Sequence, residues 1–142
     1  MRVFLRRSKK PEPELGVLQL DELIQAARTT GHVVELREDG TCCQVAPAVN
    51  TAASQIVQEA LANARLFAGG APVTVVVRYE DDAVELSVAN SRGAAWNGRG
   101  RPHGLNGMRE SARDCGGSLE AGPDGRGGFI VRARLPREPL GA

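Results

Sequence analysis

The sequence lacks the long apolar runs of a membrane protein and the excess charge of a nucleic-acid-binding protein. Its 142 residues contain 18 lysines and arginines against 17 aspartates and glutamates, so the formal net charge is only +1. This near balance removes the electrostatic argument for direct binding to nucleic acid. No apolar stretch approaches the roughly 20 residues that a membrane-spanning helix needs. The basic start, MRVFLRRSKK, is not followed by an apolar segment, so we expect a cytoplasmic protein without a signal peptide.

Cysteine is also scarce. Cys42 and Cys43 are adjacent and Cys115 is remote, so the three cysteines show none of the spacings that are typical of metal sites. An odd number of thiols is a poor disulfide framework and suits a reducing compartment. We therefore expect buried or half-buried thiols in a single domain whose composition, 42% apolar and 25% charged, provides a real core.

Residues 1–15 have the composition of a linker. They are basic and then rich in proline and glutamate, and Pro11 and Pro13 lack the amide protons that would continue a helix. We therefore place the folded domain at residues 16–142.

Hydrophobic periodicity predicts three helices. The first extends from Leu18 to a glycine stop at Gly31, and the second from Pro47 to about Ala68. The third extends from Leu105 to Cys115 and is followed by two glycines. Apolar positions at helical spacing support these helices: Leu20, Leu23, Ile24, Ala27, Val57, Leu61, Ala64, Ala68, Leu105, Met108, Ala112 and Cys115.

Apolar segments between the helices predict six strands. HVVELRE and TCCQV flank Asp39-Gly40, a dipeptide typical of hairpin turns, so we expect these two segments to pair with each other. PVTVVVRYE and AVELSVA are joined at Asp81-Asp82, and SLEAG and FIVRARLP flank the turn GPDGRGG. The element order, α-β-β-α-β-β-loop-α-β-β, predicts a two-layer α/β sandwich with the helices on one face of the sheet.

Glycine is concentrated in the second half of the sequence. Eleven of the 17 glycines lie between Gly93 and Gly128, and residues 90–103 show no periodicity. A loop of this length in a compact domain is typically functional, and its glycines allow the backbone to approach a ligand closely. The helix that follows offers free amide groups to an anion. We therefore favour a ligand lid over a flexible connection.

The second predicted helix carries a carboxylate and an amide one turn apart. Glu59 and Asn63 are at positions i and i+4, on the same side of the helix and off its apolar stripe. Their oxygens suit a hydrated Mg²⁺, but glutamate and asparagine at this spacing are also common on ordinary helix surfaces. The spacing alone does not distinguish a metal site from a solvated face.

Three segments in this order change that balance: IVQEALANARLFA, VANSRG at a strand end, and HGLNGMRESARDCGGSLEAGPDGRGGFIVRARLP. Together they resemble the ATP-binding catalytic domain of two-component sensor histidine kinases. The closer match is to the group that pairs with LuxR-type response regulators, especially as found in actinobacteria. The first segment contains the motif Gln-Glu-Ala-Leu-x-Asn, and the third contains Gly-Leu-x-Gly-Met-Arg-Glu followed by Gly-Gly. The resemblance covers roughly residues 16–136.

The resemblance implies the Bergerat (GHKL) fold, a mixed sheet with helices on one face and a glycine-rich lid over ATP. It implies that Asn63 ligates Mg²⁺ and that Glu59 is the catalytic residue, which orients water or the metal. The backbone at Gly104 and Leu105 would meet the phosphates at a helix N-terminus. Asn90 would face the adenine amino group. The other residues assigned to ATP binding are Gly93, Arg101, His103 and Gly107.

The sequence departs from the family's pattern at two places. After the metal-binding asparagine the family usually has a basic residue and then histidine, where this chain has Leu66 and Phe67. The usual adenine motif, Asp-x-Gly-x-Gly, is replaced by a segment that begins with Asn90. The amide of Asn90 can accept from the adenine amino group, but loses the charge assistance of a carboxylate, a difference of about 1 kcal/mol or more. Four lid residues either compensate at the phosphates or are ordinary solvated charges: Arg92, Arg99, Arg101 and His103.

A phosphoacceptor histidine in a dimerising helical hairpin is not found in this sequence. His32 and His103 are the two histidines, and neither lies in a predicted helical hairpin. We therefore expect a monomeric catalytic segment that does not autophosphorylate alone and needs a histidine-bearing dimerisation domain. Residues 1–15 resemble the end of that hairpin and the linker after it. The chain is then either a domain of a longer kinase or a stand-alone remnant.

Two other functions remain open at this point. One is a degenerate nucleotide-binding fold that acts as a protein-interaction or regulatory module, which the residues Leu66, Phe67 and Asn90 motivate. The other is a serine kinase of the anti-sigma type, which shares the fold. The motif Gly-Leu-x-Gly-Met-Arg-Glu fits the sensor kinases better, so we rank the serine kinase last.

Overall fold

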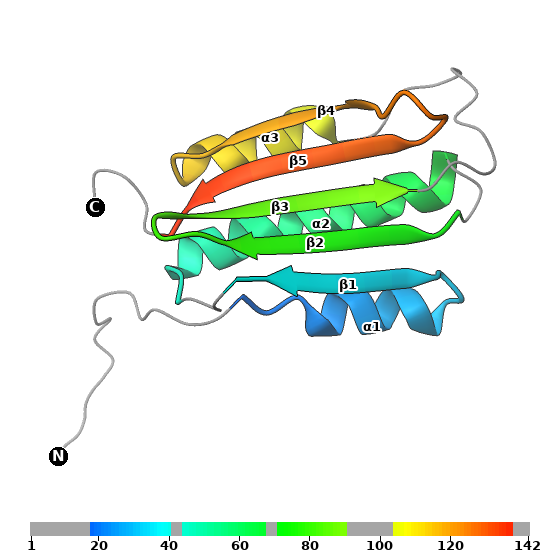
Figure 1. Cartoon of the computed structure of the whole chain (residues 1–142), viewed down its shortest axis with the longest axis horizontal. Helices are drawn as coiled ribbons and strands as arrows, with labels where there is room; N and C mark the ends of the chain where they lie inside the picture. The colour runs from blue at the N-terminus through cyan, green and yellow to red at the C-terminus, as the bar shows by residue number, and fades with distance from the viewer. Residues whose placement is uncertain (1–17, 41–43, 68–70, 91–103, 138–142) are drawn as a thin grey trace, which may run out of the picture.

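The computed structural model describes residues 18–40, 44–67, 71–90 and 104–137. Within them the chain forms two layers, a five-stranded sheet and three helices that cover one of its faces (Figure 1). The predicted two-layer α/β sandwich is confirmed. The helices are α1 (Asp21–Thr29), α2 (Pro47–Phe67) and α3 (Leu105–Asp114). The strands are β1 (Val34–Asp39), β2 (Val73–Tyr79), β3 (Ala83–Asn90), β4 (Ser118–Pro123) and β5 (Phe129–Pro136).

The sheet is mixed, with the strand order β1-β2-β3-β5-β4. β1 runs parallel to β2, whereas the other neighbouring strands are antiparallel. A parallel pair needs a crossover connection that returns the chain to the same end of the sheet, and α2 provides it. β5 follows β4 in the sequence but lies inside the sheet, between β3 and β4.

The hairpin predicted around Asp39-Gly40 is wrong. β1 pairs in parallel with β2 at the edge of the sheet, and the described sheet has five strands instead of six. Of the segment TCCQV, residues 41–43 lie outside the described ranges, and its last two residues lead directly into α2. Gly40 has a φ of 87°, and a Cβ placed on it would lie 2.6 Å from the carbonyl oxygen of Tyr79. This glycine therefore lets the chain leave the sheet close beside β2.

Apolar side chains from the covered face of the sheet and from the helices form one core. On β2 and β3 buried residues alternate with more exposed ones, as expected for a sheet that is covered on one face only. Small side chains on α2, among them Ala53, Ala60 and Ala64, are buried in this core. The predicted core residues that are buried are Leu20, Ile24, Ala27, Val57, Leu61, Ala64, Met108, Ala112 and Cys115. Those that pack against the core while half-buried are Leu23 and Leu105.

The composition led to expectations about the cysteines and about membrane-spanning helices. Cys115 is buried, its Sγ lies 3.4 Å from the carbonyl oxygen of Ala112, and burial raises the pKa of its thiol. The other two cysteines, like the predicted linker, lie outside the described residues. Among the helices of the described ranges, none combines the length and the apolar character that a membrane crossing requires.

Candidate functional site

Glu59 and Asn63 lie on the second half of α2. This helix begins at Pro47 and continues for 21 residues without an internal glycine or proline. The side chain of Asn63 is buried, with 4% exposure, whereas Glu59 is exposed. The prediction that both residues lie off the buried stripe is therefore wrong for Asn63, because α2 packs against both the sheet and α3. The helix presents one buried amide and one exposed carboxylate a single turn apart.

The start of α3 packs against Glu59. Gly104 is the N-cap of α3, has a φ of 76°, and is followed by a helix that no side chain caps. The φ of Gly104 favours glycine, and a Cβ placed on it would lie 2.5 Å from Oε1 of Glu59, so any other residue here would displace the Glu59 carboxylate. Glu59 therefore lies beside the positive end of the α3 dipole. The N–H groups in the first turn of α3 have no partner inside the helix, which makes them suitable donors to an anion.

Asn90 ends β3, at the same end of the molecule as the last turns of α2 (Figure 1). Its side chain is buried, with 7% exposure, and its backbone is in register with Val73 of β2 and Phe129 of β5. A Cβ placed on Gly128 would lie 2.4 Å from the carbonyl oxygen of Asn90. Only glycine allows the chain to approach this strand end so closely. The backbone that presents Asn90 is thus held from both sides.

The turn between β4 and β5 supports this strand end, a role that the sequence did not reveal to us. Oδ1 of Asp124 accepts hydrogen bonds from the backbone N–H groups of Arg126 (2.7 Å) and Gly128 (2.9 Å). The N–H of Asp124 donates to the carbonyl of Gly128 (3.0 Å), which closes the turn. These bonds hold Gly128 against Asn90. The aspartate in GPDGRGG could have indicated this turn, since aspartate side chains commonly accept hydrogen bonds from nearby backbone N–H groups in turns.

Acid is expected to weaken this turn. The hydrogen bonds from Arg126 and Gly128 lower the pKa of Asp124 below its ordinary value of 3.8. A carboxylate with a lowered pKa stabilises the fold at every pH above its ordinary pKa, and this contribution is lost as the pH falls through the folded-state pKa. Asp124→Asn should therefore lower the unfolding temperature at neutral pH and make it fall less steeply below about pH 4. Thermal unfolding followed by circular dichroism at several pH values measures both effects.

The exposed Asp114 offers a matched control, because Asp114→Asn removes the same charge from the end of α3. Asp114 is not one of the residues that form the turn between β4 and β5, so this variant should leave the turn intact. If Asp124→Asn keeps the pH dependence of the unmodified protein, the hydrogen bonds of Asp124 do not contribute to the stability of the turn.

The described structure brings part of the predicted site together. Glu59 and Gly104 are in contact. Leu105 packs its side chain against the core, and Gly107 is exposed with open space where a Cβ would lie. The predicted lid residues Gly93, Arg101 and His103 lie outside the described residues, so their roles stay predictions.

The last turn of α2 contains the first departure from the family's pattern. Leu66 is 61% exposed at the position where the family's basic residue is missing, and Arg65 beside it is an exposed cation that we had not considered.

His32 is 6% exposed, and in the described part of the chain its ring nitrogens have no hydrogen-bond partner. The backbone N–H of His32 donates to the carbonyl of Ala27 (3.1 Å). His32 therefore occupies the position after a glycine-terminated helix whose side chain typically packs back against the helix. A histidine buried in this way is not placed to accept a phosphoryl group.

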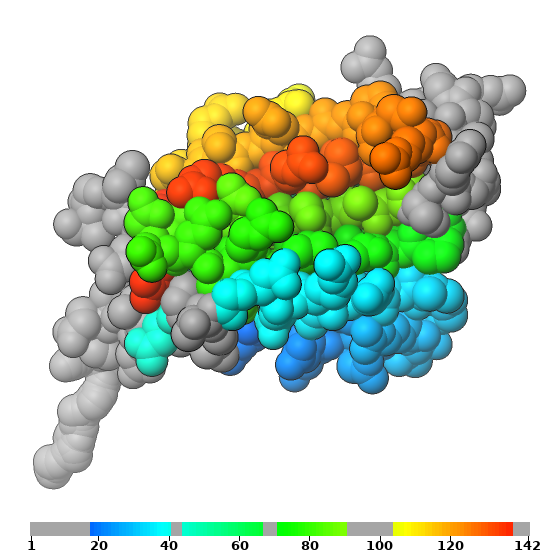
Figure 2. Space-filling view, in the orientation of Figure 1, coloured from blue at the N-terminus to red at the C-terminus, as the bar shows by residue number. Residues whose placement is uncertain are grey.

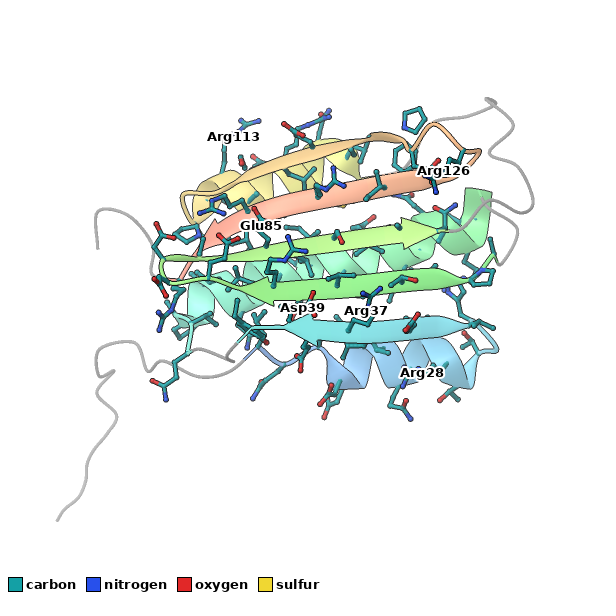
Figure 3. All side chains as sticks on the ribbon, viewed as in Figure 1. Arg28, Arg37, Asp39, Glu85, Arg113 and Arg126 are labelled. Carbon is teal, nitrogen blue, oxygen red and sulfur yellow. The ribbon has the colours of Figure 1, made fainter. Side chains whose placement is uncertain are left out.

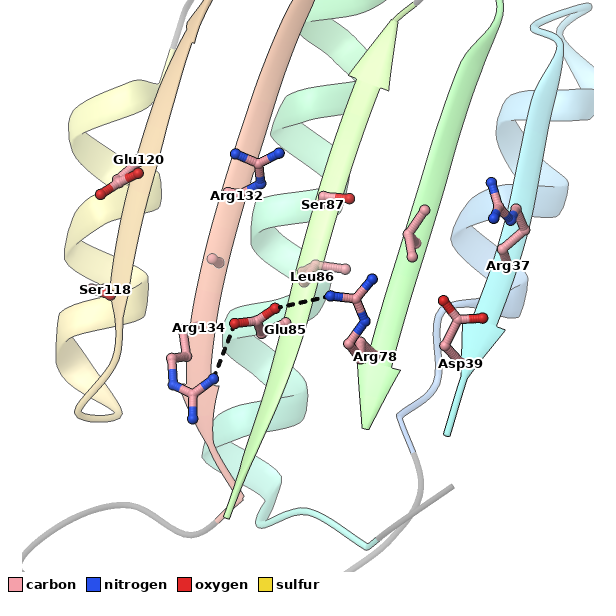
Figure 4. Close-up of a pocket in the computed structure, with 12 residues that line it drawn as sticks. Arg37, Asp39, Arg78, Glu85, Leu86, Ser87, Ser118, Glu120, Arg132 and Arg134 are labelled. Atoms are coloured by element: carbon pink, nitrogen blue, oxygen red, sulfur yellow. Dashed lines mark hydrogen bonds and ion pairs between the residues drawn. The ribbon is translucent and has the colours of Figure 1, made fainter. Parts of the chain in front are cut away.

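A shallow concavity of about 430 Å³ lies on the opposite, helix-free face of the sheet. Figure 2 shows this face toward the viewer, and Figure 3 labels Arg37, Asp39 and Glu85 on it. Glu85 pairs with Arg78 (3.6 Å) and with Arg134 (3.0 Å) on the neighbouring strands (Figure 4). Exposed pairs of this kind contribute about 0–1 kcal/mol each and are typical of a solvated sheet face. None of the candidate site residues within the described ranges lines this concavity, and we assign it no function in that site.

Solved structures that resemble this fold include catalytic domains of histidine kinases. The nucleotide-free catalytic domain of histidine kinase ThkA aligns with a TM-score of 0.66 and 19% identity, over 89% of this chain and 97% of that one. The histidine kinase domain of the E. coli osmosensor EnvZ gives 0.62 and 22%, over 95% and 96%. ThkA in complex with the response regulator TrrA gives 0.64 and 17%, over 92% and 44%. No protein-family model matches the sequence, and a comparison with curated proteins finds no match.

Because each sequence identity is below 25%, these similarities are evidence for the fold alone. The mixed five-stranded sheet with its helices on one face agrees with the architecture that the motifs implied. The chain therefore has the fold of histidine kinase catalytic domains.

Proposed function

We propose that this chain is the ATP-binding catalytic domain of a two-component histidine kinase. In this proposal it binds Mg-ATP and presents the γ-phosphate to a histidine on a separate dimerisation domain. The observation that carries the proposal is the contact between Glu59 on α2 and Gly104 at the start of α3. It joins an acidic side chain of α2 to the N-terminus of α3. The similarity to histidine kinase catalytic domains supports the same assignment.

The residues on α2 fit a magnesium ion. The amide oxygen of Asn63 and the carboxylate of Glu59 are hard oxygen ligands, and Mg²⁺ typically takes one or two such groups together with water and phosphate oxygens. The part of the chain that the structure describes contains no group of three or more His, Cys, Asp and Glu side chains that would enclose a metal by itself. When bound, the ion would neutralise charge on the phosphates. We assign Asn63 as its ligand and Glu59 to the orientation of water or metal.

The backbone of α3 supplies the phosphate-binding groups in this proposal. The N–H groups near Leu105 and Gly107 point out of the helix N-terminus, where the dipole favours a negative charge. Gly104, which has no Cβ, leaves room for the close approach of the Glu59 carboxylate. Catalysis then consists mostly of positioning the γ-phosphate and neutralising its charge. Asn90 faces the base from the end of β3, and the lid residues Gly93, Arg101 and His103 complete the site.

The proposed partners are a histidine-bearing dimerisation domain and a response regulator. The complex of ThkA with TrrA supports a response regulator as the class of partner. The motif Gly-Leu-x-Gly-Met-Arg-Glu further suggests a LuxR-type regulator and an actinobacterial kinase. We propose that this segment works in the cytoplasm as a monomer, with residues 1–15 as its linker.

Calorimetric titration of the whole chain with ADP and a non-hydrolysable ATP analogue tests the proposal. We expect both nucleotides to bind in the presence of Mg²⁺ and to bind much less tightly without it. Circular dichroism of the same sample confirms that the protein is folded. If the folded protein binds neither nucleotide at millimolar concentration, the proposal is overturned. The exposed Leu66 would then favour the alternative function, an interaction module that has lost its nucleotide.

A further inference from the structure

Two rows of side chains cross the helix-free face of the sheet and line the concavity of about 430 Å³ (Figure 4). In one row the arginines are neutralised by neighbouring carboxylates. Glu85 pairs with Arg78 (3.6 Å) and with Arg134 (3.0 Å). Arg134 also pairs with Glu80 (2.6 Å) and Asp82 (3.5 Å). The arginines of this row are therefore already engaged and are not free for a ligand.

The second row contains arginines that are not engaged in this way. In register order it consists of Arg37 on β1, Val76 on β2, Ser87 on β3, Arg132 on β5 and Glu120 on β4. Within residues 18–40, 44–67, 71–90 and 104–137, no hydrogen bond or ion pair involves the side chains of Arg37, Ser87 or Arg132. Two guanidinium groups and one hydroxyl group therefore keep their hydrogen-bond donors for a ligand.

The middle of the second row is low because its side chains are small. Val76 and Ser87 are half-buried, whereas Arg37 and Arg132 on either side of them are exposed. Neighbouring strands lie about 4.8 Å apart, so Arg37 and Arg132 are equally far from the point midway between Val76 and Ser87. Glu120 lies one strand farther away, beyond Arg132. The unpaired charges nearest to this point in the row are therefore both positive.

Two guanidinium groups beside a hydroxyl group favour a phosphate ligand. A guanidinium is a planar fork of donors that matches the oxygens of a phosphate in pairs. A phosphate monoester carries a charge of about −1.5 to −2 at neutral pH, which two arginines balance. Sites for small molecules typically have volumes of about 300–1,000 Å³, so the concavity has room for an organic group beside the phosphate.

We infer that the helix-free face of the sheet holds a ligand site of its own, which binds a small organic phosphate monoester. The hydroxyl of Ser87 and the guanidinium of Arg132 donate to the phosphate, and Arg37 approaches it from the other side. The organic group lies on Val76. This inference does not depend on the proposed function, because the helices that carry the proposed nucleotide site cover the opposite face (Figure 1).

Nuclear magnetic resonance titration of the isotopically labelled whole chain with phenyl phosphate and with inorganic phosphate tests this inference. Sodium chloride at the same ionic strength provides the baseline. We expect saturable shifts of the backbone amide signals of Val76, Ser87 and Arg132. Phenyl phosphate should bind more tightly than inorganic phosphate, because its ring removes the apolar surface of Val76 from water. Arg37→Gln and Arg132→Gln should each weaken the binding of phenyl phosphate by about threefold to tenfold.

Arg113→Gln is the matched control, because it removes the same charge from an exposed position on α3, outside the concavity. It should keep the affinity for phenyl phosphate. If it weakens binding as much as Arg132→Gln does, the attraction is a general effect of charge and the inference is wrong. Equal affinities for phenyl phosphate and inorganic phosphate overturn the assignment of an ester. Shifts confined to the amides of Leu105 and Gly107 overturn the inference and leave the proposed function standing. A folded protein that shows no saturable shift with either compound overturns the inference as well.

Discussion

Asn63→Ala is expected to weaken nucleotide binding in the presence of Mg²⁺ by at least about a hundredfold, close to 3 kcal/mol. The amide oxygen of Asn63 is the proposed protein ligand of the ion, and alanine has no atom that can replace it. Affinity measured without Mg²⁺ should change much less, so the variant should give the same weak titration with and without the ion. Isothermal calorimetry with ADP under both conditions measures this difference.

The burial of Asn63 requires a control for stability. Removing a buried polar side chain can leave its neighbours without a hydrogen-bond partner and destabilise the fold by about 1–3 kcal/mol. The unfolding temperature of Asn63→Ala should therefore be measured, and the titration made well below it. Asn50→Ala, at the other end of the same helix, is the matched variant and should bind nucleotide normally. A folded Asn63→Ala protein with full magnesium-dependent affinity would show that the metal is held elsewhere.

Gly104→Ala is expected to reduce nucleotide affinity by more than about tenfold while costing only about 1 kcal/mol of stability. The new Cβ would lie 2.5 Å from Oε1 of Glu59, so the two groups cannot both keep their positions. Glu59 is exposed and its side chain is flexible, so the carboxylate can move away at small cost. It would then leave its place beside the N-terminus of α3, where the proposed phosphate site lies. Titration with ADP and thermal unfolding of the same variant separate the two effects.

Gly31→Ala controls for the backbone strain in this experiment. Gly31 has a φ of 94° at the end of α1, and a Cβ placed on it would have no atom within 4 Å. Gly31→Ala places an alanine at a positive φ without creating a new contact. It should therefore lose about as much stability as Gly104→Ala but keep the nucleotide affinity of the unmodified protein. If Gly104→Ala binds nucleotide as well as Gly31→Ala does, the contact between Gly104 and Glu59 has no part in binding.

The helices and most of the strands could be predicted because their signals are local. Pro47 marks the observed start of α2, and the segment FIVRARLP corresponds to the whole of β5. The turn at Asp81-Asp82 joins β2 and β3 as expected, since sequential antiparallel strands pair with their neighbours. The ordered motifs likewise led to the correct fold, because they resemble histidine kinase catalytic domains, whose solved structures have this fold.

The features that escaped prediction depend on contacts between distant segments. Gly40 was interpreted as a hairpin glycine, but the carbonyl of Tyr79 in another strand is what requires it. The burial of Asn63 follows from the packing of α2 against both the sheet and its neighbouring helix α3, which cannot be read from helical spacing. The support that Asp124 and Gly128 give to Asn90 crosses between two strands that are far apart in the sequence. Such contacts are properties of the tertiary structure.

The position of β5 inside the sheet sets the order in which the sheet can be assembled. β2 and β3 can form a hairpin as soon as both have been synthesised, but β3 and β4 are joined only through β5. Until β5 is available, β3 and β4 each leave a row of backbone N–H and C=O groups unpaired, and such edges invite pairing with strands of other chains. Register pairs such as Ala83 with Pro136 then close long loops in a single late step. Newly made chains should therefore be most prone to aggregate in the interval before residues 129–136 leave the ribosome.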